Sequence, residues 1–309
     1  MTAAAPAKVN LQLSVGAVGE DGYHPLCTVF QAVSLHDEVT AVATSRGSGV
    51  SVSVRGEAAG DVPADASNLA VRAAQILAAD LGRSPDVALR IDKAIPVAGG
   101  MAGGSADAAA ALLACARLWG ADESRDALSP LAARLGADVP FLLMGGTAIG
   151  TGRGDLLTPV LAAGRYQWVF ATSAEGLSTP GVYRRFDELA EQAGAGVPEP
   201  AVDAGVVAAL RAGSPRDLGR ALSNDLQAAA ISLRPSLQAV LDRGVAAGAL
   251  GAVVSGSGPT VAFLVADDDA AMDLTVALAP TGLCKALRRA EGPVRGAAIV
   301  REGLAHPAL

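Results

Sequence analysis

The stretch IPVAGGMAGGSAD, from Ile95 to Asp107, places four glycines within six positions directly before an alanine-rich segment. An apolar run typical of a strand, VALRI, ends at position 91, and residues 105–119 are typical of a nearly all-apolar helix. Glycines let a backbone approach a ligand closely, and the first N–H groups of a helix are free to bind an anion. The sequence therefore predicts a phosphate-binding loop. A flexible linker is the alternative, although linkers are usually polar.

The commoner glycine motifs are absent from this sequence. No Gly-Lys pair occurs, so there is no Walker A loop, and neither GxGxxG nor GxSxG is present. A second glycine-rich stretch, SGSGPT, covers residues 255–260 between two apolar segments. We interpret it either as a hairpin turn or as a backbone segment that closes over the substrate side of the same phosphates.

Composition and charge narrow the class of protein. The 309 residues are 51% hydrophobic and 18% charged, which predicts a folded chain of about two domains. The net charge of −7 argues against a nucleic-acid partner. Cys27, Cys115 and Cys284 form no CxxC pair and indicate reduced thiols. The N-terminus lacks the basic region of a signal peptide and no apolar run reaches about 18 residues, so we expect a cytoplasmic protein without a membrane partner.

Hydrophobic periodicity predicts an α+β fold, because strands and helices are mixed without regular βαβ alternation. Strands are expected at 8–15, 26–35, 37–44, 49–56, 87–91 and 166–173, on both sides of 255–260, and at 294–300. Helices are expected at 68–82, 105–119, 126–135 and 179–192, and from about position 269. We place a domain boundary near Gly164, which gives domains at 1–164 and 165–309.

Three motifs together resemble a known family. They are PAKVNLQLSVG at 6–16, IPVAGGMAGGSADAAAAL at 95–112 and VSGSGPTVAFL at 254–264. In this order and spacing they resemble the motifs of the GHMP kinase superfamily, whose members phosphorylate small molecules with ATP. DGYH at 21–24, IDK at 91–93 and LGADVPF at 135–141 resemble the branch that acts on a CDP-linked methylerythritol. The resemblance implies an N-terminal α+β domain that binds ATP and a C-terminal ferredoxin-like domain, with the ligands between them.

The same resemblance implies the catalytic residues. Asp138 falls on the family's catalytic aspartate and Lys8 on its partner lysine. Such an aspartate could take the proton of the attacking hydroxyl, and a lysine beside it would keep the carboxylate ionised and stabilise developing charge. Apart from the resemblance, Asp138 would be an ordinary loop carboxylate and Lys8 a lysine at the surface edge of a strand.

The substrate side of the site is also implied by the resemblance. Tyr23 and Tyr183 would hold the cytosine ring between them, and His24 would hydrogen-bond to the edge of the base. The implied substrate-binding positions are Asn10, Tyr23, His24, Thr179, Tyr183, Gly256, Ser257 and Gly258.

For ATP, the resemblance implies a cradle around the first glycine loop. The implied positions are Asn68, Lys93, Pro96, Val97, Ala98, Gly99, Gly100, Met101, Ala102, Gly103, Gly104 and Ser105. Ala98, Ala102 and Ala106 depart from the family's loop, and we expect the first two to keep ordinary φ and ψ angles. Asp107, where asparagine is common in the family, would either face magnesium or lie solvated in the second turn of the helix. ATP chemistry implies Mg²⁺, but the sequence marks no ligands for it.

The implied activity is ATP-dependent phosphorylation of the 2-hydroxyl of the CDP-linked alcohol. The alternatives are another kinase of the superfamily, of the homoserine or mevalonate type, and a nucleotide-binding protein without turnover. We expect the partners to be small molecules alone, and the protein to be a monomer or a homodimer.

Overall fold

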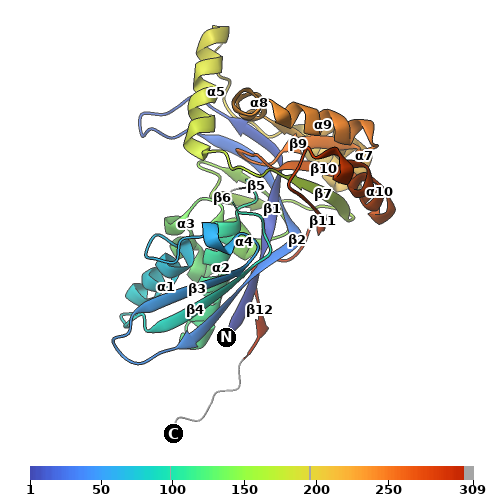
Figure 1. Ribbon diagram of the computed structural model, residues 1–309. Coiled ribbons are helices and arrows are strands. Elements are labelled where there is room, and N and C mark those ends of the chain that lie inside the picture. The colour runs from blue at the N-terminus through green and yellow to red at the C-terminus, as the bar shows by residue number, and fades with distance from the viewer. Residues whose placement is uncertain (98, 195, 303–309) are drawn as a thin grey trace.

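The computed structural model describes residues 1–97, 99–194 and 196–302, whose strands form two sheets (Figure 1). The first sheet has the order β12-β1-β2-β4-β3. In addition, β5 pairs with β2, β8 pairs with β1, and β6 pairs with β5. Its strands are β1 (Thr2–Val15), β2 (Leu26–Ala43), β3 (Val50–Gly56), β4 (Val87–Lys93), β5 (Thr147–Thr151), β6 (Leu156–Pro159), β8 (Ser223–Asn224) and β12 (Ala298–Arg301). The long antiparallel pair of β1 and β2 forms its centre.

The second sheet has the order β11-β7-β10-β9, and all of its neighbouring strands are antiparallel. Its strands are β7 (Tyr166–Thr172), β9 (Gly251–Val254), β10 (Val261–Val265) and β11 (Ala286–Gly292). Helices connect β7 to β9 and β10 to β11, which gives the β-α-β-β-α-β pattern of a ferredoxin-like unit. The predicted α+β fold with a ferredoxin-like second part is thereby confirmed.

The helices group beside the two sheets, with α1 to α4 near the first and α5, α8, α9 and α10 near the second (Figure 1). They are α1 (Leu69–Asp80), α2 (Gly103–Trp119), α3 (Arg125–Leu135), α4 (Val139–Met144), α5 (Thr179–Ala193), α6 (Ala204–Ala212), α7 (Pro215–Ala221), α8 (Gln227–Leu233), α9 (Ser236–Ala246) and α10 (Asp268–Leu278). Two short 3₁₀ turns, Ala59–Asp61 and Ala279–Thr281, complete the regular structure.

Helix α2 lies at the centre of the first core. Every residue from Ala106 to Ala116 is buried, and the helix packs against β1, β2, α1, α3 and α4. Alanine side chains are short, so the helix can approach the surrounding elements closely and still fill the space between them. The helix ends at Gly120, whose φ of +66° is the left-handed conformation common at helix C-termini. This packing fixes the direction in which the N-terminus of α2 points.

Strands β1 and β11 differ most from expectation. β1 begins at Thr2 rather than at position 8, because Ala3, Ala5 and Ala7 alternate into the core and alanine carries little strand signal. β11 was not predicted, since two arginines and a glutamate interrupt its apolar pattern. The chain passes from the first sheet to the second between β6 and β7, and β8 and β12 then return to the first sheet, so the domain boundary expected near Gly164 stays a prediction.

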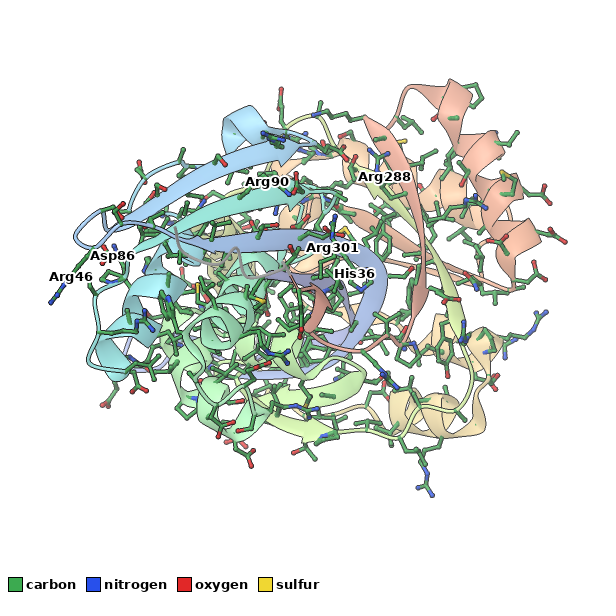
Figure 2. All side chains as sticks on the ribbon, turned by 90° about the horizontal axis from the view of Figure 1, so that it is seen from below. His36, Arg46, Asp86, Arg90, Arg288 and Arg301 are labelled. Atoms are coloured by element: carbon green, nitrogen blue, oxygen red, sulfur yellow. The ribbon has the colours of Figure 1, made fainter. Side chains whose placement is uncertain are left out.

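The two sheets are joined by buried and half-buried polar contacts. Trp168 Nε1 on β7 donates to Gln31 Oε1 on β2 at 3.0 Å. Arg288 on β11, labelled in Figure 2, donates through Nη2 to Glu57 Oε2 beyond β3 at 2.6 Å. The candidate site residues come from both sheets and depend on this junction.

Within the described ranges, no helix combines the length and apolar character needed to cross a bilayer.

Candidate active site

Lys8 and Asn10 lie two positions apart on β1 and therefore on the same face of the strand. The register between β1 and β2 shifts on both sides of this pair, at positions 6/7 and 10/12, and such bulges re-aim side chains. Lys8 Nζ donates to Asn10 Oδ1 at 2.6 Å, and Asn10 Nδ2 donates to Thr28 Oγ1 at 2.8 Å. Lys8 is 4% exposed, so it is a buried side chain held by Asn10 rather than a surface lysine.

Asp138 directly precedes α4 and faces the same cavity as Lys8. We call this space, of about 270 Å³, the acid–lysine cavity. Its lining residues are Lys8, Asn10, Leu13, Leu26, Thr28, Phe30, Ser105, Ala137, Asp138, Arg153, Thr179, Tyr183, Gly256 and Ser257. Burial lowers the pKa of Lys8, and the negative charge of Asp138 opposes this shift. The structure thus brings the two predicted catalytic residues together, with Ser105 from the first turn of α2.

The predicted phosphate loop runs from β4 into α2. Gly100 has a φ of +72°, and Ala102, the residue before the helix, has a φ of +61°. The expectation that Ala102 keeps an ordinary backbone conformation is therefore wrong. The entry into α2 requires a left-handed residue at this position, and alanine adopts it at a steric cost. Ala98 lies outside the described residues, and Ala106 is buried in the helix.

The second glycine-rich stretch is the turn of the β9–β10 hairpin, and it also packs against the first glycine loop. Ser255 N donates to Thr260 O at 2.9 Å across the turn, and Ser255 Oγ donates to Gly100 O at 3.0 Å. A Cβ on Gly100 would overlap the carbonyl oxygen of Ser255. Gly256, with a φ of +56°, faces Lys8 on the other side. The interpretation as a hairpin turn is confirmed, and closure over the phosphates stays a prediction.

A second space of about 240 Å³, the loop cavity, lies against the first glycine loop. Its lining includes Pro96, Val97, Gly99, Pro259, Thr260 and Lys285, together with residues from 57–61 and 172–176. Among the described atoms, the buried hydroxyl Oγ1 of Thr260 has no hydrogen-bond partner. A Cβ on Gly99 would lie 2.7 Å from that hydroxyl. An unpaired hydroxyl beside bare glycine backbone is a donor set that suits a phosphate oxygen.

Lys93, a predicted nucleotide contact, belongs to a buried charge cluster below the glycine loop. Its Nζ pairs with Asp37, and with Asp107 Oδ2 at 2.9 Å. Asp37 Oδ1 also accepts the N–H groups of Ala94 and Ile95, at 2.7 and 2.9 Å. Burial alone would lower the pKa of Lys93, but the charges of Asp107 and Asp37 raise it. The cluster holds the start of the glycine loop against β2.

Asp107 lies in neither of the two environments expected for it, which were a magnesium site and solvent. It is buried, and its carboxylate faces Lys93 instead of solvent or a magnesium site. Burial raises the pKa of Asp107 to about 7, although the charge of Lys93 opposes this and that of Asp37 adds to it. Its Oδ1 finds no hydrogen-bond partner among the described atoms. Two carboxylates thus share one ammonium group.

Two other predicted ATP positions have structural roles. Asn68 is the N-cap of α1: its Oδ1 accepts from Ala70 N at 2.9 Å, and its Nδ2 donates to Pro63 O at 2.7 Å. Met101 is fully buried, and its carbonyl oxygen accepts from Lys8 N at 3.2 Å. Contacts of ATP with Asn68, Met101 and Lys93 stay predictions.

The predicted base-binding residues surround a third space of about 520 Å³, the aromatic cavity. Its lining residues are Val18, Gly22, Tyr23, His24, Leu26, Ala137, Arg153, Thr179, Pro180, Tyr183, Arg184 and Asp187. The rings of His24 and Tyr183 lie 5.1 Å apart, tilted by 36°. His24 Nδ1 is 2.8 Å from Gly16 O, which can only accept, so Nδ1 carries the proton. His24 Nε2 faces Asp187 Oδ2 at 3.4 Å.

Thr179 and Tyr183 line both the aromatic and the acid–lysine cavities. The hydroxyl groups of Thr179 and Ser257 are 2.8 Å apart, which joins α5 to the second glycine loop. Burial raises the pKa of Tyr183 to about 12, and the charge of Asp138 adds to this effect. Tyr183 therefore keeps its proton at neutral pH.

Asp37, Thr260 and Arg153 are site residues that were not predicted from the sequence. A carboxylate within the apolar segment 26–43 was the available signal for Asp37, and the flanking glycines of GTGRGD were the signal for Arg153. Nothing in the sequence singled out the hydroxyl of Thr260. Across the described part of the chain, no three His, Cys, Asp or Glu side chains form a metal-binding group.

Two family models match the chain. Residues 68–146 match the GHMP kinases N terminal domain, and residues 206–279 match the GHMP kinases C terminal model. The chain is 54% identical over 300 residues to the 4-diphosphocytidyl-2-C-methyl-D-erythritol kinase of Streptomyces coelicolor, covering 97% of this chain and 99% of the relative. It is 53% identical to the enzyme of the same name from Rhodococcus jostii, covering 96% and 94%.

Solved structures share the fold. The crystal structure of a 4-(cytidine 5'-diphospho)-2C-methyl-D-erythritol kinase is 34% identical with a TM-score of 0.76, and the match covers 94% of this chain and 98% of that one. A homoserine kinase from Cytophaga hutchinsonii, 21% identical with a TM-score of 0.75, covers 97% of both chains and shows the fold alone.

Proposed function

Since the chain belongs to the GHMP kinase family, we propose that it transfers the γ-phosphoryl group of ATP to the 2-hydroxyl of 4-diphosphocytidyl-2-C-methyl-D-erythritol. The products would be the 2-phosphate and ADP, in non-mevalonate isoprenoid precursor biosynthesis. One structural observation supports the proposal independently of the relatives' names. Lys8, Asp138 and Ser105 line a single cavity, and the aromatic cavity with Tyr23 and His24 adjoins it.

In this reaction Asp138 would act as the general base. A carboxylate that faces the cavity can accept the proton of the attacking hydroxyl when the acceptor lies within hydrogen-bond reach. Lys8 is held by Asn10, so its ammonium group stays directed into the cavity. There it would stabilise the charge that develops on the transferred group. Positioning and charge stabilisation supply most of the rate in phosphoryl transfer, and a buried, fixed lysine serves both.

ATP would place its phosphates along the first glycine loop. The N-terminus of α2 presents unpaired N–H groups, and the hydroxyl groups of Ser105 and Thr260 offer further donors. Mg²⁺ usually binds through substrate phosphates and one or two protein oxygens, and it neutralises phosphate charge. The candidate protein oxygen is the hydroxyl of Ser105, which lines the acid–lysine cavity at the start of α2 and suits a hard cation of this kind.

The cytidine end of the acceptor would lie in the aromatic cavity. Tyr23 and Tyr183 offer ring surfaces for stacking, and His24 offers a polar edge to the base. Thr179, Ser257 and Asn10 line the path from this cavity toward Asp138. The site therefore offers, in order, the chemical groups that a CDP-linked alcohol requires.

We also propose that the enzyme works in the cytoplasm, with ATP and the CDP-linked alcohol as its partners and neither nucleic acid nor membrane involved. Its cysteines support this location, because Cys27, Cys115 and Cys284 are free thiols that a reducing compartment preserves. We expect a monomer or a homodimer.

A product assay tests the proposed function. The purified protein is incubated with ATP, Mg²⁺ and 4-diphosphocytidyl-2-C-methyl-D-erythritol, and the phosphorylated product is identified by mass spectrometry. Parallel reactions contain homoserine or mevalonate as acceptor. We expect product only with the CDP-linked alcohol. Turnover of homoserine or mevalonate alone would favour another kinase of the family, and ATP binding without any product would favour a nucleotide-binding protein.

A further inference from the structure

Arg153 lies at the tip of the turn between β5 and β6, where the chain reaches over the two substrate cavities. Gly152 and Gly154, on either side of it, have φ angles of +68° and +95°. Leu26 N at the start of β2 donates to Gly152 O at 2.8 Å, and Gly154 N donates to Thr151 O at 3.0 Å. The turn is therefore anchored, and the position of Arg153 is set by the backbone around it.

Arg153 lines both the aromatic and the acid–lysine cavities. Four other residues also line both: Leu26, Ala137, Thr179 and Tyr183. Arg153 is the one charged side chain of these five. Its guanidinium Cζ lies 3.9 Å from the ring centre of Tyr23, and within the described residues no carboxylate forms an ion pair with it. The junction between the cavities thus carries a cation that is not neutralised by the protein.

The proposed acceptor has a matching order of groups. Its cytosine would lie on the aromatic side, its reactive hydroxyl beside Asp138, and the diphosphate between the two must cross the junction. A guanidinium group binds phosphate oxygens through two parallel N–H donors and keeps its charge at all physiological pH values. We propose that Arg153 binds the diphosphate of the CDP-linked substrate and so distinguishes a nucleoside diphosphate from a nucleoside. This inference rests on the proposed function.

Stacking on Tyr23 is the alternative role of Arg153. A side chain that only covers this ring would support cytidine and CDP equally, because both carry the same base. A diphosphate contact would instead favour CDP. The ratio of the two affinities therefore separates the two roles, and it does so without any need for turnover.

The test is a calorimetric titration of the full-length protein with cytidine and with CDP. The wild type is compared with Arg153→Met, which keeps an unbranched apolar stem beside Tyr23, and with Arg153→Lys, which keeps the charge. Arg46→Met is the matched control. Figure 2 shows Arg46 at the tip of the loop between β2 and β3, pointing away from the body of the protein.

We expect the wild type to bind CDP more tightly than cytidine. Arg153→Met should weaken CDP binding about tenfold, the lower range for a hydrogen bond to a charged group, and leave cytidine within about twofold. Arg153→Lys should recover part of the loss, and Arg46→Met should match the wild type. With the full substrate, KM should rise about tenfold in Arg153→Met at a nearly unchanged kcat.

Two results would overturn the inference while leaving the proposed function in place. One is a CDP-to-cytidine affinity ratio in Arg153→Met equal to that of the wild type. The other is an equal loss for both ligands, which would assign Arg153 to packing on Tyr23. A wild type that binds neither cytidine nor CDP would overturn the inference and the proposed function together.

Discussion

Asp107→Asn is the most informative change in the charge cluster formed by Asp37, Lys93 and Asp107. The cluster has a net charge of −1 when all three groups are ionised, and burial raises the pKa of Asp107 to about 7 from an ordinary value of 3.8. The folded state therefore keeps a proton that the unfolded chain releases. This contribution to stability is complete below about pH 4 and is lost as the pH rises through about 7.

The size of the effect follows from the same pKa. A single proton changes the free energy of unfolding by at most about 1.4 kcal/mol per pH unit between its two pKa values. Between about pH 5.5 and 8, the free energy of unfolding of the wild type should fall by roughly 2 kcal/mol. Asp107→Asn should not show this fall. The asparagine amide has no titrating proton, and it can accept from Lys93 and donate to Asp37.

The assay is urea unfolding followed by circular dichroism at several pH values across that range. The difference between the wild type and Asp107→Asn should grow with pH in favour of the variant. Asp242→Asn, the same substitution at an exposed position on α9, serves as the control and should parallel the wild type. If the free energy of unfolding of Asp107→Asn changes with pH as that of the wild type does from pH 5.5 to 8, the reasoning about the buried cluster is refuted.

Two further predictions concern the ligand sites. Gly100→Ala should lower the free energy of unfolding by about 2 kcal/mol or more and weaken ATP binding over tenfold, because its Cβ would overlap the Ser255 carbonyl at a φ of +72°. The control is Gly120→Ala, at a position with a left-handed φ but open space around it. In urea unfolding the control should lose only about 1 kcal/mol, and it should keep its ATP affinity. Tyr23→Ala should raise KM for the CDP-linked alcohol roughly 5- to 100-fold through lost base stacking, and equal increases for ATP in steady-state kinetics would contradict this.

The sequence predicted those parts of the molecule whose signals are local. The glycine loop and α2 follow each other directly, so a single stretch contains both the flexible backbone and the helix start. The alternation in β3 is equally local. Ala102 was misjudged because a left-handed residue at a helix entry is set by the path of the chain and not by the preference of alanine.

The contacts between distant segments could not be predicted from local patterns. Asp37 and Lys93 are 56 positions apart, and Thr179 and Ser257 are 78 apart. Their pairing depends on how β2 meets β4 and how α5 meets the β9–β10 turn. The pairing of Lys8 with Asp138 came from family resemblance alone. Burial of Asp107 depends on α2 packing against β2, which the sequence of the helix does not specify.

Phosphoryl transfer in a single turnover tests the central claim, that Lys8 and Asp138 act together on the CDP-linked acceptor. The enzyme, in excess over substrate, is mixed with ATP, Mg²⁺ and 4-diphosphocytidyl-2-C-methyl-D-erythritol, and product is followed by rapid quench in the wild type, Asp138→Asn and Lys8→Met. We predict that each variant slows transfer by about 10²- to 10⁴-fold while thermal unfolding and CDP affinity stay close to wild type. Transfer at the wild-type rate by either folded variant would contradict the account.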